Sequence, residues 1–493
     1  MLSFFVQTFW TSCLPALFFH AVLIEGRDRL AANQAVQPLE IEYFRPGVGE
    51  TNKGTFINFA NTAEDAKRLY KLVILTVCDN VIDYDTKRTP TFVWQFEDRL
   101  ENYLEQERVK QEHGGSLSAA EPIQIYKQNI PRLETVRSRE CEIRWTAPRE
   151  GSYVAKVSMV LGTKPIAFGS KIVDVRDLWF VVIGDSYMSG QGNPDVESTL
   201  LPFTLPQWID PTCYRSSLSH SFLTYEKIEK QYQNFGLLFT YIACSGAGVQ
   251  KGFKTPHRRK TPQIKVIKEI QDALLDKCSC DGCCKSVPDA LLMGIGANDL
   301  EFEQIVSASL VGNIDPELRQ LPIRLSRLNR NLDWLAREFD KLNIPPDHVF
   351  YTEYFDPLRN HDGNRDASCP GLGLTTLSDF LKIDSKFRIA INQLIEDKCD
   401  KYGWNYLDGI DEAYRLHGVC SKDSYIRSLT ESLSRQSNVV GAFHPNVKGH
   451  QVVSKIVWPQ IKPKLNATMH QYTNDLRQAW NKHYTTPKTR RRG

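Results

Sequence analysis

The stretch Gly184-Asp-Ser186 has the residue types of a catalytic turn: an apolar run from 179 to 183 ends there, and small, polar residues follow. An apolar run that ends at glycine predicts a buried strand, and the residues beyond it can open a helix. Open α/β sheets bind ligands at the carboxyl ends of their strands, so Ser186 is placed to present its hydroxyl to an acyl group. Asp-Ser before a helix is also an ordinary N-cap, so the nucleophile interpretation depends on partners elsewhere.

A serine nucleophile needs a base and hydrogen-bond donors for the oxyanion, and three later segments contain such residues. Gly246 lies in a small-residue turn after an apolar run, which leaves its backbone amide open to a ligand. Asn298 follows another apolar run and carries an amide that can donate, while Asp299 is expected to cap the next helix. His444 stands before a proline, on a loop that leads into the helical pattern at 452–461. Taken singly, each also fits a structural role, as a turn glycine, a cap or a loop histidine.

In this order, Ser186, Gly246, Asn298 and His444 resemble the four sequence blocks of the SGNH hydrolases, also called the GDSL esterases and lipases. The similarity covers residues 177–461. It implies a three-layer α/β/α hydrolase domain with a parallel sheet, in which no cofactor or metal takes part. It also implies the roles: Ser186 attacks an ester carbonyl, His444 takes its proton, and the Ser186 and Gly246 amides and the Asn298 side chain hold the oxyanion.

One position departs from the family pattern. Many SGNH hydrolases have an aspartate three residues before the histidine to orient the imidazole, and this chain has Gly441 there. Some members use a main-chain carbonyl instead, which accepts the same N–H with less stabilisation of the imidazolium. We therefore expect a Ser-His dyad. Asp408 and Asp411 are carboxylates earlier in the chain, and the sequence places neither of them near His444.

The chain has 12 cysteines, which argues against a reducing compartment. One of them, Cys13, lies in an apolar N-terminal segment; the rest are odd in number, so one free thiol is expected. The sequences around Cys213 and Cys244, and Leu416-His-Gly-Val-Cys420, resemble a secreted, disulfide-bonded branch of the SGNH hydrolases. That resemblance implies a Cys213–Cys244 disulfide. Further candidate pairs are Cys369 with Cys420 and Cys78 with Cys141, and Cys399 is the candidate free thiol.

The segment Cys278-Ser-Cys-Asp-Gly-Cys-Cys284 is a separate cysteine cluster. Thiolates so close together can bind zinc, but a second, distant pair is missing and the other cysteines indicate an oxidising compartment. Disulfides in a surface loop are the favoured interpretation of this cluster. The chemistry expected of Ser186 requires no metal.

The N-terminal segment predicts secretion. Residues 1–24 are nearly all apolar or small, and residues 1–26 are interpreted as a signal peptide, with a membrane-spanning signal anchor as the alternative. Asn466-Ala-Thr468 is a glycosylation sequon for a secreted eukaryotic chain. The protein is therefore expected outside the cell, in contact with a membrane only if the N-terminal segment is retained.

The expected segments are a leader at 1–26, an accessory domain at 27–176, the hydrolase domain at 177–465 and a C-terminal tail at 466–493. Short runs of β-branched and aromatic residues predict that the accessory domain is an immunoglobulin-like β-sandwich, with a hairpin turn at 148–151. Beyond it, apolar runs alternate with helical patterns, most clearly at 322–342. This alternation indicates a parallel sheet covered on both faces.

The overall charge excludes some function classes. A net charge of +3 is too small to indicate nucleic-acid binding. The basic segment 251–260 is most simply a solvated loop, with an anionic substrate or surface as the alternative. The favoured function is a secreted serine esterase that acts on a small-molecule, lipid or glycan ester. Lipases, phospholipases and carbohydrate deacetylases of the same fold are alternatives, as is a catalytically silent binding protein; no pattern indicates an oligomeric state.

Overall fold

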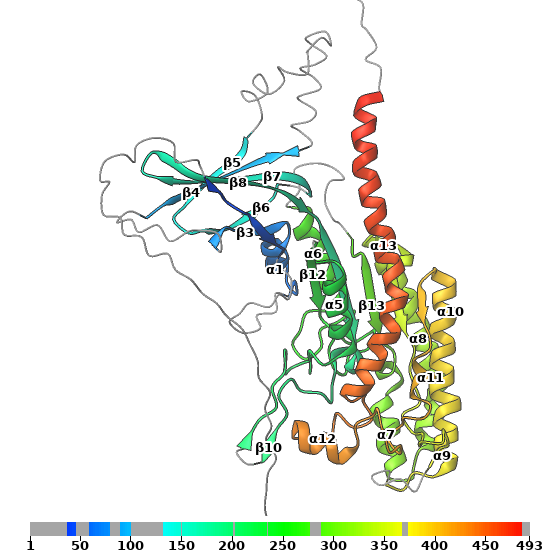
Figure 1. Ribbon diagram of the computed structural model, residues 1–493. Coiled ribbons are helices and arrows are strands. Elements are labelled where there is room, and N and C mark those ends of the chain that lie inside the picture. Colours follow the sequence, from blue (N-terminus) through cyan, green and yellow to red (C-terminus); the bar gives the residue numbers. More distant parts are fainter. Residues whose placement is uncertain are drawn as a thin grey trace, which may run out of the picture.

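The structure is a computed structural model. Its described residues form two main parts, a parallel sheet between layers of helices and a pair of sheets nearer the N-terminus (Figure 1). Both the three-layer α/β/α domain and the all-β domain predicted from the sequence are present. The described residues are 37–45, 59–78, 89–99, 132–148, 150–200, 203–233, 235–276, 287–366 and 373–485.

The parallel sheet has the strand order β12-β9-β13-β14-β15, and every neighbouring pair in it is parallel. The chain order reverses at β9, so the topological switch point lies between β9 and β13, where open sheets of this order bind ligands. Ser186 follows β9 and Asn298 follows β13, so both stand at this point. The strands are β9 (Asp177–Gly184), β12 (Gly236–Tyr241), β13 (Ala290–Gly294), β14 (Val349–Thr352) and β15 (Asn405–Leu407).

Helices cover both faces of this sheet, because alternate residues of a buried strand point to opposite sides. Phe180 and Val182 belong to the core beneath α5 and α13, whereas Val181 and Ile183 belong to the core beneath α6, α8 and α10. Strand β9 is therefore apolar at every position between its ends, as the sequence predicted. The covering helices are α5 (His220–Gln231), α13 (Val447–Thr485), α6 (Gln263–Leu275), α8 (Asp315–Lys341) and α10 (Ile389–Tyr402).

Most of the shorter elements follow the carboxyl ends of the strands, whereas the 3₁₀ turn Pro346–His348 directly precedes β14. Helices α7, α9 and α12 gather at one end of the molecule (Figure 1). The short elements are α4 (Ser186–Ser189), the 3₁₀ turns Asn298–Leu300 and Pro346–His348, α7 (Phe302–Leu310), α9 (Leu377–Ile383), the π turn Asp384–Arg388, α11 (Ile410–Tyr414), α12 (Leu429–Gln436) and the hairpin β10 (Thr199–Leu200) with β11 (Phe203–Thr204).

The N-terminal part is two sheets packed around one core, in which Phe96 stacks on Trp145 with ring centroids 4.0 Å apart. The predicted hairpin at 148–151 is wrong. Strand β6 pairs with β3, whereas β7 pairs with β4 and β8, so this connection crosses from one sheet to the other. The strands are β1 (Gln37–Pro38), β8 (Lys164–Val175), β7 (Gly151–Leu161), β4 (Thr91–Asp98) and β5 (Arg132–Ser138) in one sheet, and β2 (Glu42–Phe44), β3 (Leu72–Thr76) and β6 (Glu142–Thr146) in the other.

Two of the predicted disulfides are present, and the predicted free thiol is confirmed. Cys78 is bonded to Cys141 beside the β-domain core, and Cys213 to Cys244 beside the hydrolase core. Cys399 is a buried free cysteine. Cys420 also takes part in a disulfide, while its predicted partner Cys369 lies outside the described residues.

Residues 59–70 lie within the stretch assigned to the accessory domain, yet they pack on the hydrolase sheet. Phe59 forms a parallel bridge with Phe239 of β12, and the Ala60 N–H donates to the Phe239 carbonyl at 2.9 Å. Helix α1 (Ala63–Leu69) then packs against α6 and buries Leu69 in the hydrolase core. A piece of the N-terminal part thus extends the edge of the parallel sheet.

A buried ion pair joins the two parts at the start of β9. Arg45 Nη2 donates to Asp177 Oδ1 at 2.7 Å, and both side chains are almost fully buried. Asp177 Oδ2 accepts from the backbone N–H of Lys71 at 3.1 Å. A buried charge is tolerated when it is paired and hydrogen-bonded in this way, and losing one partner typically costs about 3–5 kcal/mol.

Several sequence-based predictions fall partly or wholly outside the described residues. The leader at 1–26, Cys13 and the cluster at 278–284 lie there, and the domain boundaries stay predictions. Asn466 lies in α13, which continues to Thr485, and its Oδ1 accepts from Tyr232 at 2.7 Å; glycosylation at Asn466 is untested. Within the described part of the chain, no helix has the length and apolar character needed to span a bilayer.

Candidate active site

Ser186 begins the short helix α4, directly after the buried strand β9. Asp185 is the N-cap of that helix, and its Oδ1 accepts from the Tyr187 N–H at 3.0 Å. The structure thus gives Asp185 the bracing role expected of it. Burial raises the pKa of the Asp185 carboxyl to about 7, although the hydrogen bond from Tyr354 opposes the shift. The serine hydroxyl stands at the carboxyl edge of the sheet, where the sequence predicted it.

His444 lies next to this serine. Its Nε2 is 2.8 Å from Ser186 Oγ, and its Nδ1 is 3.0 Å from the main-chain oxygen of Ala442. A carbonyl can only accept, so Nδ1 carries the proton and Nε2 is left free to accept from the serine hydroxyl. In this tautomer His444 can remove the serine proton. Two residues 258 positions apart in sequence therefore form the expected dyad geometry.

A main-chain oxygen thus occupies the place of the usual third carboxylate. Among the described residues, no carboxylate accepts a hydrogen bond from His444. Asp411 instead binds Arg388 at 2.7 Å and the Asp356 N–H at 2.8 Å. Asp408 does not bond to the imidazole either, and its main-chain oxygen accepts from Gln460 Nε2 at 3.3 Å.

The pKa of His444 is lowered to about 4, because burial disfavours the charged ring more than the carbonyls of Ala442 and Gly441 favour it. The neutral, basic ring therefore persists well below the ordinary histidine value. We expect kcat/KM for ester hydrolysis to stay nearly constant from neutral pH down to about pH 5, and to fall by half at a pH of about 4. A pH–rate profile of kcat/KM measures this.

The acid limb must be separated from unfolding. Burial also lowers the pKa of His220 to about 3 and that of His450 well below 6.5. At these two histidines the unfolded chain binds more protons below pH 6.5, so their contribution to folding stability falls as the pH drops through that range, while the raised pKa of Asp185 acts in the opposite direction. The activity that each sample regains after its return to pH 7 is used to correct the low-pH rates for protein lost by unfolding. An acid limb near pH 6.5 with full recovery would contradict the neutral His444 of the structure.

Close packing explains why residue 441 is a glycine. A Cβ added to Gly441 would lie 2.7 Å from the Cα of Gly192 and 2.8 Å from the side-chain amide atoms of Gln436. Real Cβ atoms do not approach backbone so closely. The loop that carries His444 is packed against the loop after the nucleophile, and this contact leaves no room for an aspartate.

Gly441→Asp is therefore expected to lower activity and stability rather than to complete a triad. Overpacking of this kind costs about 1–3 kcal/mol of unfolding free energy. Thermal unfolding and kcat/KM measure the two effects, and Gly441→Ala is the matched control because it has the Cβ without the carboxylate. An aspartate variant that is more active than both the wild type and the alanine variant would show that a carboxylate fits there.

The residues of three candidate oxyanion donors, Ser186, Gly246 and Asn298, line one pocket. In the part of the chain that the structure describes, the backbone N–H groups of Ser186 and Gly246 donate to no protein acceptor. Asn298 Nδ2 donates to the Ala247 carbonyl at 2.8 Å, and its second hydrogen is available to a ligand. Gly246 has a φ of +78°, and His257 Nε2 would lie 3.2 Å from a Cβ added there, so only glycine fits comfortably.

Asn298→Ala removes one of these donors. We expect kcat for a p-nitrophenyl ester to fall about 10²–10³-fold with a much smaller change in KM, because the donor acts on charge that develops in the transition state. Steady-state kinetics measure the split. Asn298 also holds Ala247, so circular dichroism is needed to confirm folding; a folded variant that loses less than tenfold would remove Asn298 from the oxyanion site.

The sequence did not reveal the groups that hold these segments together. Gln263 binds both polar backbone atoms of Gly184, with its Oε1 2.8 Å from N and its Nε2 2.9 Å from O. Tyr354 Oη donates to Asp185 Oδ2 at 2.8 Å. Asp299 does not cap a helix as expected: its Oδ2 accepts from the Val249 N–H at 2.8 Å and so fixes the loop after Gly246. These contacts join distant strands, and no local pattern signals them.

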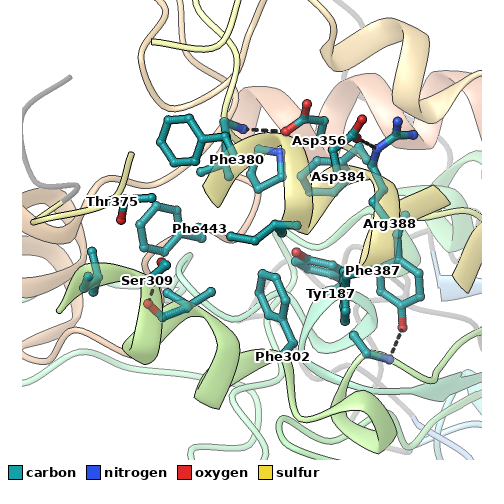
Figure 2. Close-up of a pocket in the computed structure, with 18 residues that line it drawn as sticks. Tyr187, Phe302, Ser309, Asp356, Thr375, Phe380, Asp384, Phe387, Arg388 and Phe443 are labelled. Carbon is teal, nitrogen blue, oxygen red and sulfur yellow. Dashed lines mark hydrogen bonds and ion pairs between the residues drawn. The ribbon is translucent and has the colours of Figure 1, made fainter. Parts of the chain in front are cut away.

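A pocket of about 890 Å³, which includes open solvent at its mouth, contains the predicted site residues. Ser186, Gly246, Asn298 and His444 all line it. An apolar cavity adjoins this pocket and is lined largely by rings (Figure 2). The structure has no cluster of three or more potential metal ligands among its described residues.

Comparisons with known proteins concern the fold. No protein-family model matches the chain, and no curated protein matches its sequence. A solved extracellular lipase from Streptomyces rimosus is 19% identical, covers 58% of this chain and 99% of its own, and has a TM-score of 0.37. A phospholipase A1 from Streptomyces albidoflavus is also 19% identical, covers 58% of this chain and 98% of its own, and has a TM-score of 0.37. An acetylxylan esterase from Geobacillus stearothermophilus is 12% identical, covers 58% of this chain and 94% of its own, and has a TM-score of 0.32. At these values the similarity says nothing about the substrate of this chain.

Proposed function

We propose that this protein is a secreted serine hydrolase of carboxylic esters that works through an acyl-enzyme. The observation that carries the proposal is the contact between Ser186 Oγ and His444 Nε2 at 2.8 Å, in the pocket that also contains free backbone donors. A histidine so close to a serine hydroxyl activates it as a nucleophile when its other nitrogen is held as a donor. Ala442 provides that hold.

The reaction follows from these positions. The Ser186 hydroxyl donates its proton to His444 Nε2 as Oγ attacks the ester carbonyl. The negative charge that develops on the carbonyl oxygen is stabilised by the Ser186 and Gly246 amides and by Asn298. His444 then gives its proton to the leaving alcohol oxygen, and a water molecule, deprotonated by His444 in turn, releases the acid and restores the serine. The imidazolium is stabilised by a carbonyl instead of a carboxylate, which lowers the expected rate.

Secretion is part of the proposal. The disulfides Cys78–Cys141 and Cys213–Cys244 support an oxidising compartment. A small-molecule, lipid or glycan ester is the expected partner, and a catalytically silent protein on the same scaffold is the competing hypothesis. The dyad distance favours an enzyme, because a binding protein has no need to keep a serine and the correct histidine tautomer in contact.

The test combines labelling with turnover. The wild-type protein should react with a fluorophosphonate probe, and mass spectrometry should locate the adduct on the peptide that contains Ser186. It should also hydrolyse p-nitrophenyl esters from acetate to palmitate, and the preferred chain length separates esterase from lipase. Absence of labelling and of turnover on every ester would favour the silent binding protein.

A further inference from the structure

The active-site pocket has two chemically different sides. On one side, Phe302, Val306, Leu310 and Phe443 line both this pocket and the adjoining apolar cavity. On the other side lie the oxyanion donors and Arg258. An ester bound at Ser186 would therefore have an apolar environment for one part and a cationic environment for another.

The apolar cavity accepts an acyl chain only if its rings move apart. The rings of Tyr187, Phe302, Phe380 and Phe443 face it (Figure 2), and the room open to a guest in this conformation is about 40 Å³. An acyl chain is larger than that, so an entering chain would displace the rings. The charged groups at its edge are paired: Arg388 Nε donates to Asp384 at 2.5 Å, and Asp356 accepts from Arg359 Nε at 3.0 Å. No charge is therefore left to repel an apolar ligand.

Arg258 has one edge of its guanidinium held by the protein and the other open. Its Nη1 donates to the Thr212 carbonyl at 2.9 Å, and its carbon lies 5.3 Å from the ring centroid of Tyr214. Its Nη2 lies 3.9 Å from the position of a Cβ added to Gly246, beside the oxyanion donors. Among the described residues, no carboxylate pairs with Arg258. A guanidinium in this position can bind an anion with two parallel N–H donors.

Other charges around Arg258 add to the positive potential. Lys251, Lys254, Arg259 and Lys260 lie on the same segment and are mostly exposed. The nearby carboxylate of Asp210 is already paired, with Arg215 and with Lys260. Glu303 also lines the pocket, but it belongs to α7 beside the apolar side. Among the described residues that line the pocket, Arg258 is thus the one permanent cation, on the side of the oxyanion donors.

We propose that the substrate is a phospholipid, with an acyl chain in the apolar cavity and the phosphate of the alcohol part on Arg258. This assignment depends on the proposed ester hydrolase function. Water is consumed at the acyl ester, a fatty acid and a lysophospholipid are released, and the phosphate itself is not attacked. A neutral lipid would leave Arg258 unpaired, and an acetylated acidic polysaccharide would leave the cavity empty, so the phospholipid fits both sides.

The surroundings of the pocket support a lipid source for the substrate. Helices α7, α9 and α12 gather at one end of the molecule (Figure 1). Apolar side chains on or next to these helices are unusually exposed: Val311, Leu374, Leu377, Leu381, Leu433, Val439 and Val440. Exposed apolar residues grouped near a binding site typically contact a lipid or protein surface.

The first test uses matched substrates and matched variants. Dihexanoyl phosphatidylglycerol and dihexanoyl glycerol have the same acyl esters and differ in the phosphate. For Arg258→Gln, the ratio of kcat/KM for the anionic to the neutral ester should fall about 10–100-fold, mainly through KM, because a charge-assisted hydrogen bond is lost. Arg259→Gln is the control: Arg259 does not line the active-site pocket, so its ratio should change far less.

The second test addresses the acyl side. Val306 lines both the pocket and the cavity, and Val306→Trp should obstruct the passage between them. The kcat/KM for p-nitrophenyl decanoate should fall at least tenfold relative to acetate. An equal fall for both esters would show that the acyl chain does not use the cavity.

Several outcomes would overturn the phospholipid assignment while leaving the esterase intact. One is a wild-type enzyme that hydrolyses p-nitrophenyl esters but prefers dihexanoyl glycerol or an acetylated acidic polysaccharide. Another is an Arg258→Gln variant that loses both lipids equally, which would make Arg258 a general aid to the oxyanion. Equal effects of the two arginine variants would show unspecific attraction. Failure on every ester, with no fluorophosphonate label, would instead count against the proposed function itself.

Discussion

Ser186→Ala is expected to lower kcat for ester hydrolysis by on the order of 10⁴-fold or more, because it removes the atom that forms the acyl-enzyme. The fold should survive, because among the described residues only His444 forms a hydrogen bond with Ser186 Oγ. KM should change little, because the oxyanion donors and both sides of the pocket remain. The variant should also lose the fluorophosphonate adduct.

A serine on the neighbouring loop provides the control for this experiment. Ser198 Oγ donates to the Ser434 carbonyl at 2.7 Å and does not line the pocket. Ser198→Ala should therefore keep both the label and the turnover. Full turnover by the Ser186→Ala protein would remove Ser186 from the reaction and leave the turn with a structural role only.

His444→Ala should lower kcat/KM by a similar factor, because the serine hydroxyl has no other base within hydrogen-bond distance in the described structure. The double variant with Ser186→Ala should be scarcely slower than either single variant, since the two side chains act as one unit. Activity that falls further in the double variant would show that the two residues act in separate steps. Steady-state and single-turnover rates on one p-nitrophenyl ester measure all three variants.

Chemical rescue distinguishes loss of the base from loss of the fold. Imidazole added to the His444→Ala protein should restore part of the rate, because truncation leaves space beside Ser186 Oγ. His417 offers a control, since it lies outside the pocket and its Nδ1 is 2.7 Å from the main-chain oxygen of Asp423. His417→Ala should keep nearly full activity and show no response to imidazole. A His444→Ala protein that is folded and as active as the wild type would contradict the assignment.

The sequence predicted the catalytic segments well because each follows a strand with a strong local pattern. Ser186 and Asn298 follow completely apolar runs, and parallel strands bring their ends to one edge regardless of the distance in sequence. His444 was harder to place, since its loop has no strand to position it. Its order in the chain and the motif around it were the signals.

The remaining features depended on contacts between distant segments. The carbonyl of Ala442 carries no signal in the sequence, because every residue has one. The steric reason for Gly441 is the loop at Gly192, about two hundred and fifty positions earlier. The sequence predicted a solvated loop around Arg258, with an anionic substrate or surface as the alternative. A charge pattern alone does not show which arginine lines a pocket.

The insertion of residues 59–70 into the edge of the parallel sheet bears on how the catalytic part can be prepared and how it folds. A fragment that begins at Asp177 would uncover β12, whose partner at Phe59 would be gone, and would remove α1 from the core beneath α6. It would also lack Arg45, the ion-pair partner of Asp177. An open, apolar strand edge of this kind promotes aggregation. We therefore expect a fragment that keeps residues 59–70 to fold more readily than one that begins at Asp177.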